Sequence, residues 1–370
     1  MSFYITLLFA VIIISIFFSL IESKIGEKIQ LPYLIIVFVI IFMISAIRSD
    51  NVGSDTINYK QIFMNIGNYG FESPFFKKFP IYSFYNLLLF KISSNFLIVN
   101  IVNGAIIYSL LLFSIKKLSV NIYLSNVLFV LLYCYFDTFN ITRQYISISL
   151  LLLSFFLFIS KKKKWIFTFV SSILIHASAV IGATYVVFYK INWNVKRYFL
   201  LSILSFIFFI NMERLLRIFY KIFPMYKVYS SENNAQISIV TSGNANKLVL
   251  YVFYLIFIIL GIMIVNYNLD KNNKIFRTQL AIVLFSIIPS FMFPNNILLE
   301  RTLVILNINY IFVIPGVIKY FSKIFKEYSV SKRIFEIVVC IALLIPFYFQ
   351  LNNNNGRIIP YKTIYKTELQ

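Results

Sequence analysis

The sequence predicts an all-α, polytopic integral membrane protein with about ten to twelve transmembrane helices and short re-entrant or interfacial helices between them. Hydrophobic residues make up 60% of the 370-residue chain, charged residues make up only 13%, and the mean hydropathy is +0.84. Soluble domains carry about 25% charged residues, so lipid must cover much of this protein. Apolar stretches of about 20 residues, long enough to cross a bilayer, recur along the chain. No polar stretch reaches the size of a soluble domain, which predicts a single transmembrane domain over residues 1–370.

The predicted spans cover residues 4–21, 31–47, 96–115, 121–139, 141–160, 198–210, 248–265, 280–293, 298–318 and 335–349. The apolar piece 81–90 is too short to cross and is interpreted as an interfacial or re-entrant element. Residues 165–189 are consistent either with one ordinary span or with a helix that turns back, broken near His176. An irregular backbone at membrane depth needs a protein or water cavity around it.

Lysine clusters orient these spans. The net charge is +21, and the strongest cluster is Lys161–Lys164. Because positive residues accumulate in cytoplasmic loops, the clusters are placed inside. The polar segment 48–80, with short helices, and the segment 211–247 then become outer loops. The basic residues lie at the ends of apolar runs, so they indicate membrane topology and no nucleic-acid partner.

Several arginines remain on the predicted outer side, against the usual charge bias. They are Arg48, Arg143, Arg214, Arg217 and Arg301. Arginine binds phosphate with two parallel hydrogen bonds and keeps its charge, so the set favours an anionic lipid-linked ligand at the outer leaflet. The alternative is snorkelling from helix ends, or pairing with nearby carboxylates such as Asp137 and Glu300.

Acidic and imidazole side chains complete the candidate site. Asp50 and Asp55 follow the second span, and either could act as a base or hold a sugar hydroxyl. Asp55 could instead cap a short helix over residues 56–67. His176 is the only histidine and lies in an apolar stretch, where an ionisable residue suggests function; packing is the alternative. One His and two separate Cys predict no zinc-type metal site and no cofactor.

The order of these motifs resembles the EpsG family of bacterial membrane proteins, which belong with Wzy-type polysaccharide polymerases. The resemblance is carried by Arg48-Ser-Asp-Asn-Val-Gly-Ser-Asp-Thr-Ile-Asn-Tyr59, Thr142-Arg-Gln-Tyr145, Ile175-His-Ala-Ser-Ala179, Glu300-Arg301 and Ile359-Pro-Tyr361. Together they span nearly the whole chain in the family's order. One departure is Phe79-Pro-Ile-Tyr82, where family members often carry a Glu-x-Gly-Tyr-like element. If that glutamate binds sugar in the family, its role is either missing in this chain or taken by Glu72.

The resemblance implies a membrane glycosyltransferase in the bacterial cytoplasmic membrane, multi-pass, with its active site facing outside. It would transfer an undecaprenyl-pyrophosphate-linked glycan chain onto a sugar hydroxyl of the next lipid-linked repeat unit. A flippase would supply the units and a chain-length regulator would be a further partner. The product would be a capsule, an O-antigen or an exopolysaccharide.

Roles follow as hypotheses. Arg143 and Arg301, with Arg48, would hold the pyrophosphate, and His176 or Asp55 would take the proton from the acceptor hydroxyl. Sugars or their linkages would be bound by the remaining polar residues of the motifs and outer loops: Asp50, Tyr59, Gln144, Arg214, Arg217 and Glu300.

Three other functions stay open at this point. A polysaccharide ligase would use the same donor with a different acceptor, although ligases usually carry one large outer loop and 211–247 is modest in size. A flippase or transporter of lipid-linked oligosaccharide would tend to show internal repeats, which the sequence lacks. A membrane acyltransferase would need an acidic residue close to its histidine, and His176 has no such neighbour in sequence.

Overall fold

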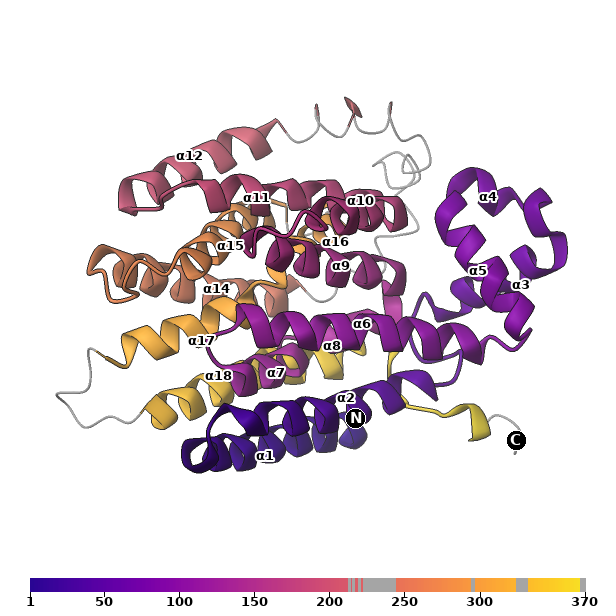
Figure 1. Ribbon diagram of the computed structural model, residues 1–370, viewed down its shortest axis with the longest axis horizontal. Helices are drawn as coiled ribbons and strands as arrows, with labels where there is room; N and C mark the ends of the chain where they lie inside the picture. The colour runs from indigo at the N-terminus through magenta and orange to yellow at the C-terminus, as the bar shows by residue number, and fades with distance from the viewer. Residues whose placement is uncertain are drawn as a thin grey trace. The chain divides into compact units, whose positions relative to one another are not determined.

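The computed structural model describes residues 1–211, 244–293, 297–323 and 332–366, together with positions 214, 217, 218 and 221. These residues are helical, and their only β-type pairing is an isolated bridge between Arg48 and Thr363. The predicted all-α polytopic fold is therefore confirmed (Figure 1). The helices form two compact units, residues 1–180 with 351–370, and residues 181–350. Whether the two units make one transmembrane domain stays a prediction.

Seven helices within the described ranges are long and apolar enough to cross a membrane, or up to nine spans if each of two bent helix pairs counts as one. The sequence predicted ten to twelve transmembrane helices, which is more than the seven to nine found here. One predicted span, 198–210, corresponds to a helix of only 16 residues, Val195–Ile210, which is shorter than the helices counted as spans. Residues 165–190, which the sequence left open, are divided into two shorter apolar helices at His176. Such a division does not change the apolar composition, so a count of apolar residues does not reveal it.

The first unit begins with a helical hairpin. Its helices are α1 (Ser2–Ile25), η1 (Glu27–Ile29) and α2 (Gln30–Ala46). Gly26 lies between α1 and η1 with a φ of 84°, a left-handed conformation that glycine adopts at no steric cost. The hydroxyls of Ser15 and Tyr33 share a 2.8 Å hydrogen bond that fastens the hairpin within its apolar surroundings.

Further along the first unit, a group of short helices precedes the long ones. The short helices are α3 (Thr56–Tyr69), η2 (Gly70–Glu72), α4 (Pro74–Lys78) and α5 (Pro80–Ile92). Ser73 caps α4 and Pro74 occupies its first turn. Phe63 of α3 packs with Leu89 of α5 in a buried cluster that also contains Phe96 and Val99. The expected short helix 56–67 is thus present, as α3.

Five longer or more deeply packed helices complete this part of the first unit. They are α6 (Leu97–Leu118), α7 (Ile122–Leu131), α8 (Cys134–Asn140), α9 (Thr142–Ile159) and α10 (Trp165–Ile175). Helix α9 packs against α6 and α10, and the Ser147 hydroxyl donates to the Ser172 carbonyl across the α9–α10 contact. Helices α7 and α8 are bent by 52° where Tyr133 adopts a left-handed backbone. After the bend, α8 ends at Asn140, directly before the Thr142–Tyr145 motif that begins α9.

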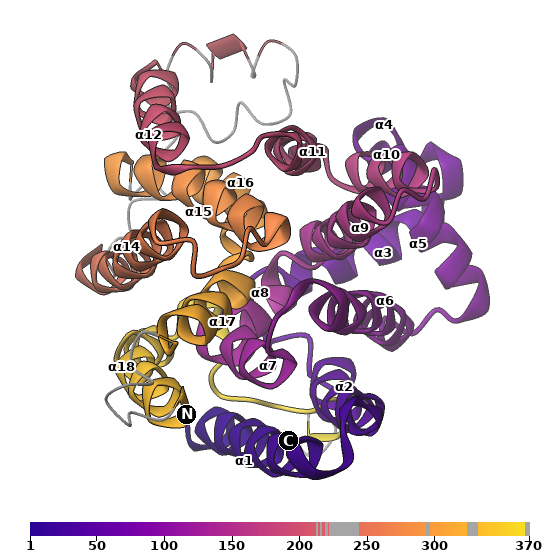
Figure 2. The same ribbon diagram turned by 60° about the vertical axis from the view of Figure 1, so that its left-hand side comes forward.

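The C-terminal segment, drawn in yellow, passes the end of α2 and holds the loop that follows it (Figure 2). Ser49 N–H donates to the Lys362 carbonyl at 2.8 Å, and Ile364 N–H donates to the Ile47 carbonyl at 3.1 Å. Farther along the loop, Gly53 N–H donates to the Arg357 carbonyl at 3.0 Å. The loop 47–55 is therefore fixed by residues more than three hundred positions away in the sequence.

Asn140 connects this loop to the start of α9. Its side-chain oxygen accepts hydrogen bonds from the backbone N–H of Ser54 at 2.5 Å and from the Ser54 hydroxyl at 3.0 Å. Thr56 donates to the Phe139 carbonyl at 3.2 Å. The motif after α2 and the motif that begins α9 are consequently held together by direct hydrogen bonds.

Replacing Gly53 by alanine should destabilise the protein by about 2–3 kcal/mol. Gly53 has a φ of 105°, and an added Cβ would lie 2.6 Å from Thr56 Oγ1 and 3.0 Å from the Phe139 carbonyl oxygen. Gly70→Ala is the matched control, because Gly70 also has a positive φ of 55° but open space around the added Cβ. Thermal unfolding in detergent should show a loss of only about 1 kcal/mol for the control. Equal losses in the two variants would contradict the packing of this loop on α8.

The second unit is centred on α15. Its helices are α11 (Ala183–Lys190), α12 (Val195–Ile210), α14 (Asn244–Asn266), α15 (Lys274–Met292), α16 (Ile297–Asn307), α17 (Tyr310–Phe321) and α18 (Lys332–Asn352), the last of which continues into the first unit. Helix α15 contacts α11, α12, α14, α16 and α17. Asn273 caps its first turn by accepting from Phe276 N–H at 3.1 Å. The predicted loop 211–247 lies for the most part outside the described residues.

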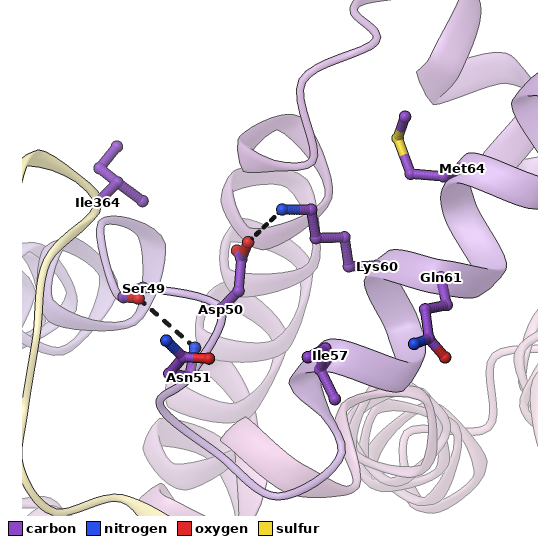
Figure 3. Close-up of a pocket in the computed structure, with 8 residues that line it drawn as sticks. All are labelled: Ser49, Asp50, Asn51, Ile57, Lys60, Gln61, Met64 and Ile364. Atoms are coloured by element: carbon purple, nitrogen blue, oxygen red, sulfur yellow. Dashed lines mark hydrogen bonds and ion pairs between the residues drawn. The ribbon is translucent and has the colours of Figure 1, made fainter. Parts of the chain in front are cut away.

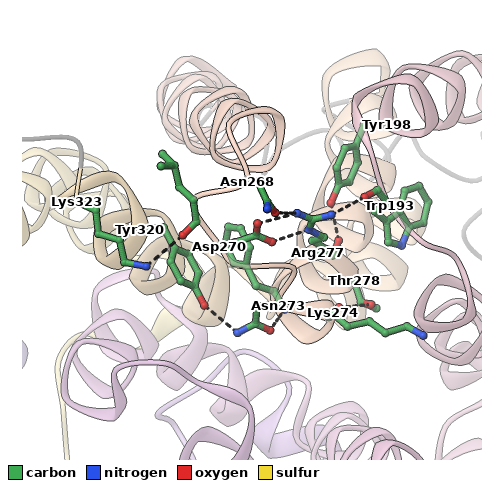
Figure 4. A network of polar contacts seen from close by, with 12 residues as sticks. Trp193, Tyr198, Asn268, Asp270, Asn273, Lys274, Arg277, Thr278, Tyr320 and Lys323 are labelled. Carbon is green, nitrogen blue, oxygen red and sulfur yellow. Dashed lines mark hydrogen bonds and ion pairs between the residues drawn. The ribbon is translucent and has the colours of Figure 1, made fainter.

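An ion pair organises one end of this second unit (Figure 4). Arg277 holds Asp270 with two hydrogen bonds, Nε to Oδ2 at 2.6 Å and Nη2 to Oδ1 at 2.7 Å. The Asp270 side chain is fully buried and that of Arg277 is 14% exposed. Arg277 also donates to the Trp193 carbonyl at 3.1 Å. Arg277 therefore joins the α14–α15 loop to the segment before α12.

Replacing Arg277 by lysine should lower the stability of the protein by about 1.5–3 kcal/mol, because an ammonium cannot form the two parallel hydrogen bonds to Asp270. Arg333→Lys offers a control, since Arg333 is exposed at the start of α18. Unfolding temperatures in detergent should fall for the first variant and stay unchanged for the second. Identical unfolding temperatures would mean that the bidentate pair contributes nothing.

Candidate functional site

Arg143 lies in the first turn of α9, against a cluster of aromatic rings. Its guanidinium carbon is 3.8 Å from the centre of the Phe79 ring and 5.6 Å from that of Tyr82. Tyr59 packs edge-on against Tyr82 with ring centres 6.3 Å apart. We call Tyr59, Phe79, Tyr82 and Arg143 the Arg143 cluster. It joins α3, the start of α5 and the start of α9.

Arg143 is half-buried and forms no ion pair with any carboxylate that the structure describes. The pairing with Asp137, one alternative from the sequence, is therefore not formed. The Nε atom of Arg143 is buried without a hydrogen-bond partner in the described part of the chain. The N-terminal end of α9 also carries positive potential, and Arg143 lies in its first turn. The side-chain charge and the helix backbone therefore both favour an anion beside Arg143.

The two phenols of the cluster are held in their neutral form. Burial raises the pKa of Tyr59, and the positive charge of Arg143 opposes that effect only in part. Burial likewise raises the pKa of Tyr82. Neutral phenols donate hydrogen bonds, so both side chains are suited to phosphate or sugar oxygens and neither is suited to act as a base at neutral pH.

Gln144 and His176 meet at Ser178. The Gln144 amide donates to the Ser178 hydroxyl at 3.4 Å, and that hydroxyl is 2.6 Å from Nδ1 of His176. Helix α10 ends at Ile175, and His176 has an extended backbone (φ −148°, ψ 115°) before the 3₁₀ helix η3 (Ala177–Gly182). The helix break that the sequence offered as one of two possibilities is thus present at His176. Because Gln144 follows Arg143, α9 connects the histidine to the Arg143 cluster.

Arg48 occupies a different environment from the one that an exposed phosphate ligand would need. It is 3% exposed and its Nη1 donates to the carbonyl of Ser45 at 2.6 Å and to the Ser45 hydroxyl at 2.9 Å. Its guanidinium lies 4.7 Å from the centre of the Phe139 ring. Burial lowers the pKa of Arg48, and nearby tyrosines counteract this only partly. These contacts indicate a part in holding α2 and α8 in place beside the site.

The two carboxylates after α2 have separate surroundings. Asp55 is half-buried at the start of α3, but its side chain makes no capping hydrogen bond there, so capping does not explain it. Asp50 forms an ion pair with Lys60, Oδ2 to Nζ at 2.5 Å, and lines a pocket on another side of α3. Of the two carboxylates, Asp55 is the one whose negative charge helps to raise the pKa of Tyr59.

The other candidate residues lie in the second unit. Glu300 pairs with Lys247 at 2.7 Å and not with its neighbour Arg301, which is half-buried on α16. Arg214 and Arg217 are exposed. Their roles in binding substrate stay predictions. Asn295 and Asn296, which precede α16, lie outside the described residues.

Sequence reasoning missed Phe79, Tyr82, Ser178 and Lys60. Aromatic residues make up 19% of the chain, so two more near the end of a loop carry no signal by themselves. A sharper signal was available for Phe79 and Tyr82, because they occupy the segment where the chain departs from the family's usual pattern. Within the described ranges, no group of three or more His, Cys, Asp or Glu residues could hold a metal ion.

Comparison with known proteins supports the resemblance seen in the motifs. The sequence model of the EpsG family matches residues 31–363, nearly the whole chain. This range contains all five motifs and also the two aromatic residues of the Arg143 cluster that lie outside them, Phe79 and Tyr82. No curated protein and no solved structure matches the chain.

Proposed function

The chain belongs to the EpsG family of Wzy-like polysaccharide polymerases, and we propose that it joins lipid-linked repeat units at the outer face of the bacterial cytoplasmic membrane. The donor would be a glycan chain on undecaprenyl pyrophosphate. The acceptor would be a sugar hydroxyl of the next repeat unit, itself on the same lipid carrier.

The observation that carries this proposal is the position of Arg143. A guanidinium stacked on Phe79, with no carboxylate partner among the described residues, is pre-organised for an anion at the N-terminal end of α9. A pyrophosphate on a membrane-embedded lipid is such an anion. Contact with the Phe79 ring restrains the guanidinium, and a restrained guanidinium can offer two parallel hydrogen bonds to phosphate oxygens.

The reaction needs one proton acceptor and one stabilised leaving group. The acceptor hydroxyl oxygen attacks the anomeric carbon of the donor sugar, and the bond from that carbon to the phosphate oxygen breaks. The bonding electrons leave with undecaprenyl pyrophosphate, whose added charge Arg143 stabilises. His176 takes the hydroxyl proton on its imidazole, held by Ser178 at 2.6 Å. Asp55 is the alternative base.

Deleting the gene in its host tests this assignment. A polymerase deletion should leave single repeat units and no long glycan, and expression of the intact chain should restore the ladder of lengths. Long glycan that remains on the lipid carrier, without transfer to its final acceptor, would instead identify a ligase. An absence of repeat units at the outer face would identify a flippase or transporter.

A further inference from the structure

An open pocket of about 560 Å³ lies beside α3, within the first unit (Figure 3). Its lining comes from the loop after α2, from α3 and from the C-terminal segment: Ser49, Asp50, Asn51, Ile57, Lys60, Gln61, Met64 and Ile364. This volume is in the range of sites that hold small organic ligands.

Helix α3 separates the pocket from the Arg143 cluster. Ile57, Lys60, Gln61 and Met64 are spaced at i, i+3, i+4 and i+7, so they share one face of the helix. Phe63 and Ile66 are buried on another face of α3. Tyr59, which packs against Tyr82 in the Arg143 cluster, also lies away from the pocket face. A ligand in the pocket would therefore lie one helix diameter from the proposed pyrophosphate site, about 10–12 Å.

The charges of the pocket cancel. Asp50 and Lys60 form an ion pair at 2.5 Å and are the only ionised side chains in the lining. An anionic ligand would have to separate this pair or face the Asp50 carboxylate. The pocket is thus unsuited to a phosphate, in contrast to the Arg143 cluster.

The uncharged lining has a mixed character. The side-chain amides of Asn51 and Gln61 make no hydrogen bond to any residue within the described ranges, and each offers both a donor and an acceptor. Ile57, Met64 and Ile364 supply apolar contacts. Sugar rings present hydroxyl groups at their edges and C–H groups on their faces, which these two kinds of side chain complement.

We infer that this pocket is a subsite for an uncharged sugar of the glycan, separate from the site that holds the pyrophosphate. The inference rests on the proposed function, because it takes its ligand from the same lipid-linked repeat units. The subsite would hold a sugar some distance from the reacting bond and so position the chain across α3. Ile364 makes the C-terminal segment part of this subsite.

The test is a binding titration with purified, full-length protein in detergent. The probe is the lipid-free oligosaccharide released by mild acid from the host's own lipid-linked repeat units. The double variant Asn51→Ala/Gln61→Ala should bind it at least tenfold more weakly than the wild type. Asn58→Ala is the matched control: Asn58 is an exposed amide on α3 outside the pocket, so its replacement should leave binding unchanged.

Two further measurements separate this inference from the proposed function. Arg143→Lys should retain oligosaccharide binding, and inorganic pyrophosphate should not compete for it. If the wild type fails to bind the oligosaccharide, or if the double variant binds as well as Asn58→Ala, the subsite is wrong even when the gene restores polymer in cells. If the gene fails to restore polymer, the proposed function is wrong whatever the binding data show.

Discussion

Arg143→Lys should reduce polymer formation about 100- to 1,000-fold, because the loss of one fixed donor to a developing charge typically costs that much in rate. Lysine keeps the positive charge, but its ammonium has no planar group to place against the Phe79 ring, whose centre lies 3.8 Å from the guanidinium carbon of Arg143. The measurement is glycan chain length in the deletion host, with the level of the membrane protein determined in parallel.

Arg333→Lys serves as the matched control for this substitution. Arg333 is exposed near the start of α18 and is not part of the Arg143 cluster. Its replacement should leave chain length and yield unchanged. A normal glycan ladder from Arg143→Lys, at normal protein level, would exclude the bidentate role assigned to Arg143.

His176→Gln should reduce polymer formation about 100- to 10,000-fold, the usual range for the loss of a general base. The glutamine amide can still form a hydrogen bond to Ser178, which in the wild type lies 2.6 Å from Nδ1, so local structure is preserved while proton uptake is lost. Ser178→Ala should have a smaller effect, about tenfold, since it only positions the imidazole.

The pH dependence of the reaction distinguishes catalysis from structure at this position. A histidine must be neutral to accept a proton, so the wild-type rate should fall at acidic pH. This acid limb should be absent from the residual rate of His176→Gln. If the limb persists in His176→Gln but disappears in Asp55→Asn, the base is Asp55 and the role of His176 is to support the turn after α10.

Much of the helical architecture could be predicted from apolar run length. Helices α1, α2, α6, α9 and α14 lie where the sequence places spans, because a continuous apolar run leaves a helix as the only way to satisfy the backbone in lipid. The bend between α7 and α8 could not be predicted, since the apolar pattern continues through it. It depends on the left-handed backbone at Tyr133, whose hydroxyl donates to the Asn355 carbonyl far along the chain.

The sequence was enough to propose residues for the candidate site, but it did not reveal their environments. Arg143, Gln144 and His176 were identified by residue type and position, and the structure brings Gln144 and His176 to one serine. Arg48 was identified by the same reasoning, yet it is buried among aromatic side chains from distant helices. A sequence shows that an arginine stands at the end of a span, but long-range packing decides whether its guanidinium can meet a ligand.

Reconstitution of the purified protein shows whether this chain by itself joins repeat units. Purified protein in liposomes would receive undecaprenyl-pyrophosphate-linked repeat units from its own host, and the products would be separated by length. We expect a ladder of glycans on the lipid carrier, with one undecaprenyl pyrophosphate released for each bond formed. Arg143→Lys should produce almost none. Single repeat units left unchanged by a folded, membrane-inserted protein would contradict it.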